Sequence, residues 1–290
     1  MEDTIVLYPS PGRGHLFCMV ELGKQILKHQ PSISITIIIS TLPTEPFPAD
    51  DPYFSTLSTA YPSITLLHLP KVSLPPTTSF SPLDFVASFF ELPELSNTNL
   101  HQALLNLSKS FNIKALIIDF FCSAAFEFVS SRHNIPVYFF FTSGASGLSA
   151  FLHLPVLDKI FTKSLKDLDI IIDLSWLMMK SAGIVINTSE LLEHRALQAI
   201  QEGKCDGNEP VPPLFCVGPL VALPLREAED EPFVSAPELE ERLIELMNSK
   251  KGEAVRERVL KLSEDAVAAK SDGGSSCVAM AKLVDSFKKR

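Results

Sequence analysis

A histidine near the start of the chain is the first residue whose position could support acid–base chemistry. His15 ends the segment PSPGRGH at residues 9–15, between a short apolar run and a helical pattern. Loops of this kind lie at the carboxyl edge of a parallel sheet, where α/β proteins bind ligands. The positive end of a helix dipole disfavours imidazolium, so the ring is expected to be neutral and able to accept a proton. A histidine that merely caps or packs the helix is the alternative on spacing alone.

A carboxylate is the natural partner for this histidine. Asp119 ends the apolar run Ala115–Asp119, which places it at the same edge of the predicted sheet. A buried carboxylate is costly unless it is paired. A pair with His15 would orient the imidazole and stabilise its charged form after proton uptake. The alternative is that Asp119 only caps a helix that begins near Cys122, and the residues alone leave both interpretations open.

The elements that would position these residues alternate along the chain. The predicted strands are 4–8, 34–40, 65–69, 115–119, 137–141 and 183–187, and the predicted helices are 15–29, 82–110, 122–132, 146–157 and 190–201. The strands are apolar on both faces, as expected when helices cover both sides of a sheet. This alternation predicts an α/β fold with a Rossmann-like, doubly wound parallel sheet.

The composition excludes several classes of function. A net charge of −9 and a pI near 5.3 disfavour nucleic-acid and anionic-membrane partners. The five cysteines are widely spaced without a CxxC pair, which indicates neither a disulfide framework nor a zinc site. The start shows no signal peptide, and no apolar stretch reaches the length of a membrane span. We therefore expect a soluble cytoplasmic protein without a metal site.

The composition changes sharply after residue 221. Of the last 69 residues, 26 are charged, against 33 of the 221 before them. Ser235 and Glu238 form a capping box, with a proline in the first turn of the helix that they begin. Three helices with apolar stripes are predicted, the third carried by Val278, Ala281, Val284 and Phe287. Short amphipathic helices are marginal alone, so each stripe needs a partner surface.

Five ordered segments give the chain a specific resemblance. They are PSPGRGH at 9–15, DFFC at 119–122, FFTSGA at 140–145, INTSELLE at 186–193 and VGPL at 217–220. Together they closely resemble the N-terminal domain of plant UDP-dependent glycosyltransferases of family 1, in particular those that glucosylate flavonoids and chalcones. The resemblance implies the N-terminal half of a GT-B fold, in which two Rossmann-like domains face each other across the active site.

The resemblance also implies roles for individual residues. His15 matches the catalytic base, and Asp119 matches its carboxylate partner. Thr142 matches a residue that contacts the sugar or phosphate of the donor, and Arg13 and Phe121 match positions that line the acceptor pocket. In such enzymes the histidine deprotonates a phenolic hydroxyl, which displaces UDP from a UDP-sugar, commonly UDP-glucose, with inversion. No metal or cofactor is implied, since the UDP-sugar is a co-substrate.

The donor-binding signature of that family is missing from this sequence. The chain contains no WAPQ-like turn and no HCGWNS-like helix start, and its single tryptophan is Trp176. Instead, VGPL runs directly into a segment that resembles the extreme C-terminal end of the same family, whose last helix crosses back onto the N-terminal domain. We therefore divide the chain into an acceptor-binding domain, 1–221, and a helical remnant of the donor-binding domain, 222–290. A second, smaller gap is expected near Asp169–Ile172.

This absence sets the expectations for activity. A positioned base contributes about 10²–10⁴-fold in rate, whereas alignment of two bound reactants contributes on the order of 7–11 kcal/mol. The chain alone is therefore expected to transfer little or no sugar. The alternatives are a catalytically silent module that binds an acceptor or pairs with a homologue, and a non-productive gene product. A nicotinamide-dependent oxidoreductase is disfavoured because the GxGxxG fingerprint is absent.

Overall fold

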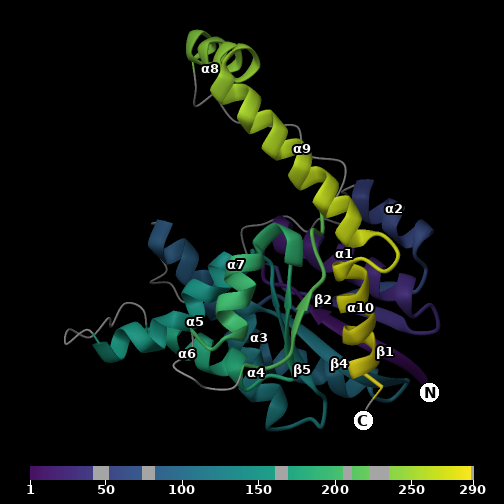
Figure 1. Ribbon diagram of the computed structural model, residues 1–290. Helices are drawn as coiled ribbons and strands as arrows, with labels where there is room; N and C mark the ends of the chain where they lie inside the picture. Colours follow the sequence, from purple (N-terminus) through teal and green to yellow (C-terminus); the bar gives the residue numbers. More distant parts are fainter. Residues whose placement is uncertain (42–51, 74–81, 161–168, 205–210, 222–234, 289–290) are drawn as a thin grey trace.

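A single parallel sheet of seven strands forms the centre of the molecule (Figure 1). The computed structural model describes residues 1–41, 52–73, 82–160, 169–204, 211–221 and 235–288. The strand order is β3-β2-β1-β4-β5-β6-β7. The strands are β1 (Glu2–Tyr8), β2 (Ser34–Ile39), β3 (Ile64–His68), β4 (Phe111–Asp119), β5 (Val137–Phe141), β6 (Gly183–Ile186) and β7 (Leu214–Cys216). The order reverses direction at β1, between β2 and β4, and this confirms the predicted doubly wound α/β class.

Side chains of each central strand alternate between two separate cores. Ile5 and Leu7 belong to the core on one face of the sheet, and Val6 and Tyr8 belong to the core on the other. Because successive strand residues point to opposite faces, a strand covered on both sides must be apolar throughout. This explains the continuous apolar runs in the sequence.

Helices cover both faces. The first core is closed by α1 (Arg13–His29), α2 (Pro52–Ala60) and α10 (Ser275–Ser286). The second core is closed by α3 (Pro82–Leu107), α4 (Ser123–Ser130), α5 (Ala145–Ile160), α6 (Asp169–Met179) and α7 (Glu190–Gln201). A short 3₁₀ helix, η2 (Phe120–Cys122), joins β4 to α4. None of the helices in the described part of the chain combines the length and apolarity that crossing a membrane requires.

Two helices near the C-terminal end leave this body. In Figure 1, α9 (Lys250–Lys270) extends away from the sheet and α8 (Ala236–Asn248) packs against its far end. We call α8 and α9 the hairpin. The predicted capping box is present, since the Ser235 hydroxyl accepts a hydrogen bond from the Glu238 N–H. No α8 side chain is buried, so the apolar stripe of this helix is exposed.

The last helix returns to the body. Met280, Leu283, Val284 and Phe287 of α10 lie in the first core, together with side chains of α1. The Ser276 hydroxyl donates to the Gly218 carbonyl oxygen at 2.7 Å, and Lys270 Nζ donates to the Pro219 carbonyl oxygen at 3.2 Å. The predicted stripe on this helix was partly wrong: Val278 and Ala281 are exposed, and Met280 and Leu283 take their place in the core.

Most predicted elements are present, with shifted ends. β4 begins at Phe111, four residues before the predicted start, and α1 begins two residues before His15. The prediction missed β7, α2 and α6. The domain boundary predicted between residues 221 and 222 stays a prediction. Helix α10 lies after this boundary, yet its apolar side chains belong to the first core of the sheet body.

Candidate active site

His15 lies in the first turn of α1, as its spacing predicted. β1 ends at Tyr8, and the chain turns through Gly12, whose φ of 103° is a conformation that favours glycine. The helix begins at Arg13, and the Leu16 N–H donates to the Gly12 carbonyl oxygen. The loop thus brings a half-buried imidazole to the carboxyl edge of the sheet, beside the neighbouring strand β4.

The imidazole is paired with a fully buried carboxylate. His15 Nδ1 lies 2.8 Å from Asp119 Oδ2, and the Asp119 side chain has no solvent exposure. An ionised carboxylate only accepts hydrogen bonds, so this contact assigns the proton to Nδ1 of the neutral ring. The lone pair of the ring is then on Nε2, on the opposite side from the carboxylate. This is the tautomer that a general base held by an aspartate requires.

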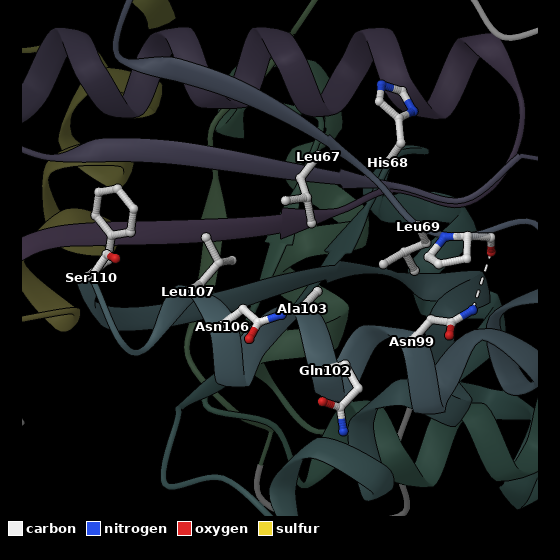
Figure 2. A pocket seen from close by; sticks show the side chains of 11 residues that line it. Leu67, His68, Leu69, Asn99, Gln102, Ala103, Asn106, Leu107 and Ser110 are labelled. Carbon is white, nitrogen blue, oxygen red and sulfur yellow. Dashed lines mark hydrogen bonds between the residues drawn. The ribbon is translucent and has the colours of Figure 1, made fainter.

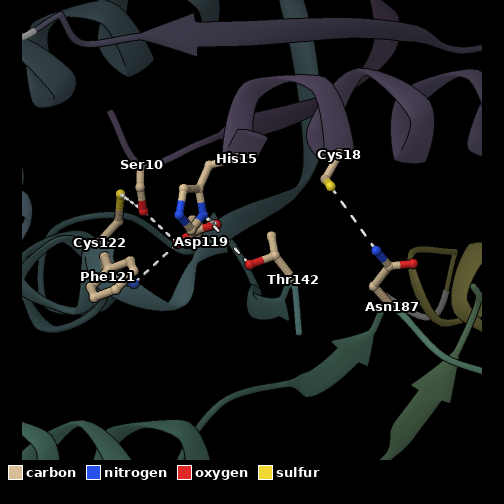
Figure 3. A network of polar contacts seen from close by, with 8 residues as sticks. All are labelled: Ser10, His15, Cys18, Asp119, Phe121, Cys122, Thr142 and Asn187. Carbon is tan, nitrogen blue, oxygen red and sulfur yellow. Dashed lines mark hydrogen bonds and ion pairs between the residues drawn. The ribbon is translucent and has the colours of Figure 1, made fainter. Parts of the chain in front are cut away.

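The second oxygen of the Asp119 carboxylate accepts hydrogen bonds from two neighbouring segments (Figure 3). Asp119 Oδ1 accepts a hydrogen bond from the Ser10 hydroxyl and another from the Phe121 N–H, the latter at 3.2 Å. Asp119 is therefore the N-cap of η2 and the partner of His15 at the same time. The carboxylate therefore contacts His15 through one oxygen and caps η2 through the other, whereas α4, which follows, has Cys122 as its N-cap.

Thr142 comes from the next strand and lies on the same side of the site. It follows β5, which pairs with β4, and its Oγ1 lies 3.5 Å from His15 Nδ1. This contact is long for a hydrogen bond. The structure therefore brings Thr142 beside the imidazole, with Asp119 as the closer partner of the same nitrogen (Figure 3).

The other two predicted residues differ in whether they contact His15. The Phe121 ring meets the imidazole edge-on, with centroids 5.5 Å apart, and packs on Phe90 at 5.0 Å. It forms an apolar wall beside the base. The exposed Arg13 places its guanidinium over the Phe17 ring, 5.3 Å from the centroid.

Glu193 is a site-supporting residue that the sequence analysis missed. Its carboxylate accepts hydrogen bonds from the Ala145 N–H at 2.6 Å, the Ser146 N–H at 3.0 Å and the Ser146 hydroxyl at 2.7 Å. Burial alone would raise the pKa of Glu193, but the hydrogen bonds, led by those from Ser146, lower it. A Cβ atom on Gly144 would collide with this carboxylate, which explains the glycine beside it. Glu193 therefore fixes the start of α5 and the loop that carries Thr142.

Asn187 links two of the recognised segments to each other. Its Oδ1 accepts the Leu220 N–H at 2.6 Å, and its Nδ2 donates to the Leu220 carbonyl oxygen at 3.4 Å. Gly218 packs so closely on Asn187 that a Cβ atom would lie 2.5 Å from Oδ1. These contacts of Asn187 connect the segment INTSELLE to the segment VGPL. The two segments therefore support the structure around the site.

A hollow of about 390 Å³ lies elsewhere, between β3, α3 and the start of β4 (Figure 2). Leu67, Leu69, Ala103 and Leu107 line it together with the carboxamides of Asn99, Gln102 and Asn106. Asn99 Nδ2 donates to the Pro70 carbonyl oxygen at 3.3 Å. None of the residues predicted from the sequence to act on a substrate lines this hollow.

Metal ligands do not gather in the part of the chain that the structure describes. No group of three or more His, Cys, Asp or Glu side chains there is arranged to hold a metal ion. Cys18, Cys122, Cys216 and Cys277 are free thiols, and Cys205 lies outside the described residues. Burial, followed by the charge of Asp119, raises the pKa of the Cys122 and Cys18 thiols.

Comparison with known proteins finds plant UDP-glycosyltransferases among the relatives of this chain. No protein-family profile matches the chain. The chain is 40% identical over 253 residues to UDP-glycosyltransferase 88B1 of Stevia rebaudiana, covering 77% of this chain and 54% of that protein. It is 37% identical over 270 residues to isoflavone 7-O-glucosyltransferase 1 of Glycine max, covering 79% and 56%.

Solved structures share the fold. A UDP-glucosyltransferase from Polygonum tinctorium matches with a TM-score of 0.82 and 16% identity, covering 100% of this chain and 99% of that chain. Phytolacca americana UGT2 matches with a TM-score of 0.81 and 17% identity, covering 99% and 100%. At this level of identity the likeness shows the GT-B-type fold alone. By sequence, the chain is a relative of the plant UDP-glycosyltransferases and spans about half the length of the curated relatives it matches.

Proposed function

We propose that this chain carries the acceptor-binding half of a UDP-sugar-dependent glycosyltransferase, with His15 as the base. The contact of 2.8 Å between His15 Nδ1 and the buried Asp119 carboxylate is the observation that supports this most strongly. It leaves Nε2 as the proton acceptor, beside the aromatic wall formed by Phe121. The relatives named above act as UDP-glycosyltransferases, which supports the reaction class.

The proposed reaction is an inverting transfer to a phenolic hydroxyl. His15 Nε2 accepts the proton of the hydroxyl, and Asp119 stabilises the imidazolium that forms. The phenolic oxygen attacks the anomeric carbon of the UDP-sugar, and UDP leaves with the bonding electron pair. Similar proteins are named for isoflavones, anthocyanidins and phloretin, and for glucose, so we propose a flavonoid-like acceptor and UDP-glucose. The reaction uses no metal or organic cofactor.

The donor side is the part that we propose to be impaired. Thr142 would contact the sugar or phosphate of the donor, and Arg13 with Phe121 would border the acceptor. The sequence offers no WAPQ-like or HCGWNS-like segment to hold the uracil, ribose and phosphates. Alignment of two bound reactants contributes on the order of 7–11 kcal/mol, more than a positioned base. We therefore expect this chain, in a reducing compartment such as the cytoplasm, to bind an acceptor and to transfer little sugar by itself.

Ligand-dependent unfolding and absorbance test the proposal. Phloretin at a hundredfold excess over its dissociation constant should stabilise the chain by about 2.7 kcal/mol, and UDP-glucose should give no shift of the melting temperature. If His15 is the base, the absorbance of bound phloretin should move toward that of the phenolate. His15→Ala should bind phloretin without this spectral change, and His194→Gln, on the exposed side of α7, is the matched control. Phenolate formation that survives in His15→Ala would rule out His15 as the base.

A catalytically silent binding module is the second candidate. The exposed apolar side chains of the hairpin favour it, since contiguous exposed apolar surface marks interaction sites. For such a module, phloretin would still stabilise the chain, but the spectrum of the bound phenol would be the same in His15→Ala and the unmodified protein. An aggregating product that no ligand stabilises would instead indicate a non-productive gene product.

A further inference from the structure

A cysteine and a histidine that the proposed reaction does not use meet at the junction of α1 and α10. Cys277 lies in the first turn of α10, and its Sγ is 3.5 Å from His29 Nε2 at the end of α1. Both side chains are half-buried. Neither residue belongs to the site around His15 and Asp119.

The histidine is held in the tautomer that can take a proton from the thiol. His29 Nδ1 lies 3.0 Å from the Gln25 carbonyl oxygen, which can only accept a hydrogen bond. The ring proton is therefore on Nδ1, and Nε2 presents its lone pair to the Cys277 thiol. A thiol beside a base in this arrangement is the form that is activated as a nucleophile.

A cavity adjoins the pair and is lined by positive charge. Its volume is about 250 Å³, and its lining includes Lys28, Lys270 and Asp272 besides the Cys277–His29 pair. Lys28 and Lys270 are positively charged and Asp272 is negatively charged. The first turn of α10, where the helix dipole is positive, also lines the cavity. The cavity is smaller than typical drug-sized sites of about 300–1,000 Å³, so it suits one charged arm of a larger anionic molecule.

The other described cysteines lack this setting. Burial raises the pKa of the Cys18 and Cys122 thiols, and it raises the pKa of Cys216 to about 12. The thiolate is the reactive form of cysteine, so these three thiols are poor nucleophiles at neutral pH.

We propose that Cys277 is a site of reversible modification, where the thiol exchanges with an anionic disulfide of the glutathione type, one arm of which enters the cavity. His29 Nε2 accepts the proton of the thiol, and the thiolate sulfur attacks one sulfur of the disulfide. The S–S bond breaks as the new one forms, and the departing thiolate leaves with the bonding electrons and takes the proton from the imidazolium. The products are a mixed disulfide on Cys277 and one free thiol. Lys28 and Lys270 bind the carboxylates of the incoming molecule.

Modification by glutathione disulfide gives the first test. Because Cys205 lies outside the described residues, the experiment uses the full chain with Cys205→Ser. Intact-protein mass spectrometry and peptide mapping should find one adduct, on Cys277, formed at least about tenfold faster than any adduct on the other three cysteines. Cys277→Ser should abolish it. Earlier modification of Cys18, Cys122 or Cys216 would overturn the proposal.

The pH dependence of the rate separates a base from a merely structural residue. His29→Gln should slow the reaction about tenfold near pH 7, where a free thiol is only a few per cent ionised. The rates of His29→Gln and of the parent should converge at high pH, where thiols ionise without help. His194→Gln is the matched control and should match the parent throughout. A constant ratio between His29→Gln and the parent at every pH would show that His29 is not the base.

The charge of the disulfide tests the role of the lysines. Lys28→Gln should slow the reaction with glutathione disulfide and leave the reaction with the uncharged bis(2-hydroxyethyl) disulfide unchanged. Equal slowing with both reagents, or no slowing with either, would overturn the assignment of an anionic ligand.

Discussion

The sheet body and the hairpin both contain helices with apolar side chains but bury those side chains very differently. In the body, the central strands carry side chains with no solvent exposure on both faces. In the hairpin, α8 buries no side chain, and α9 buries only Gly252 and Ala269. Both regions satisfy helix patterning and capping, so local signals alone do not create a core. The stability of the chain must come from the body.

The largest expected difference between the two regions lies in their apolar side chains. Phe139 in β5 is fully buried, whereas Leu260 in α9 is 62% exposed. Phe139→Ala should lower the free energy of unfolding by about 3–5 kcal/mol, because it removes buried surface and leaves a cavity. Leu260→Ala should change it by less than about 0.5 kcal/mol. Urea denaturation measures both, and equal losses would mean that the hairpin is packed against a surface in solution.

Removal of the buried Asp119 carboxylate should cause the second-largest loss of stability. Asp119→Ala removes the acceptor of hydrogen bonds from His15, Ser10 and the Phe121 N–H. Each buried donor left unsatisfied costs about 1–3 kcal/mol, so we expect a loss of about 3 kcal/mol in urea denaturation after partial relaxation. Glu257→Gln, on the exposed surface of α9, is the matched control and should be neutral. A neutral Asp119→Ala would show that water replaces the carboxylate.

The carboxylate that caps α5 should have a smaller and pH-dependent effect. Glu193→Gln should cost about 1 kcal/mol at neutral pH, as for the loss of a helix cap. The folded pKa of Glu193 is lowered, so its contribution is present above the unfolded pKa and is lost as pH falls through the folded pKa. As pH falls from about 4.5 through the lower folded pKa, urea denaturation should therefore bring the variant and the parent progressively together. Glu245→Gln is the matched control and should differ little from the parent at every pH, because its ion pairs with Arg242 and Lys251 are exposed and contribute little to stability.

The smallest expected effect concerns two histidines that join α3 to the end of α4. His101 Nδ1 lies 2.8 Å from His133 Nε2. Burial, then His101 and Arg132, lower the pKa of His133. The unfolded chain therefore binds a proton more readily, and stability should fall as pH drops below about 6.5. Thermal unfolding of His133→Gln should depend less on pH in this range, and His194→Gln should keep the slope of the parent.

The sheet could be predicted from sequence because its strands have a strong local signal, whereas the residues alone left the His15–Asp119 pair as one of two interpretations. Apolar runs of five or more residues mark strands, and the loop after one such run and the end of another lie at the same edge of a parallel sheet, which places His15 and Asp119 at that edge. β7 escaped prediction because three residues make too short a run. Helix α10 was predicted, but its buried face was assigned to the wrong residues because its surroundings come from distant segments.

The supporting residues of the site could not be predicted from their own neighbourhood. Glu193 reads as an exposed helix residue, yet its partners are 47 and 48 residues away in the chain. Ser10 reads as a turn residue, and its acceptor Asp119 is 109 residues away. Such contacts depend on tertiary geometry, which composition and periodicity do not encode. The exposure of the apolar side chains of the hairpin likewise depends on which distant segments pack against it, and the sequence of the hairpin does not specify them.

The hydrogen bonds from Lys270 and Ser276 to the carbonyl oxygens of Pro219 and Gly218 have a consequence for modularity. They join the point where the chain leaves the body to the point where it comes back, so the intervening segment behaves as an insertion between two fixed ends. The entropy of closing such a loop grows only slowly, at about 0.6 kcal/mol for each doubling of its length. The entropy of closure therefore sets only a weak limit on the length of the segment inserted at this position.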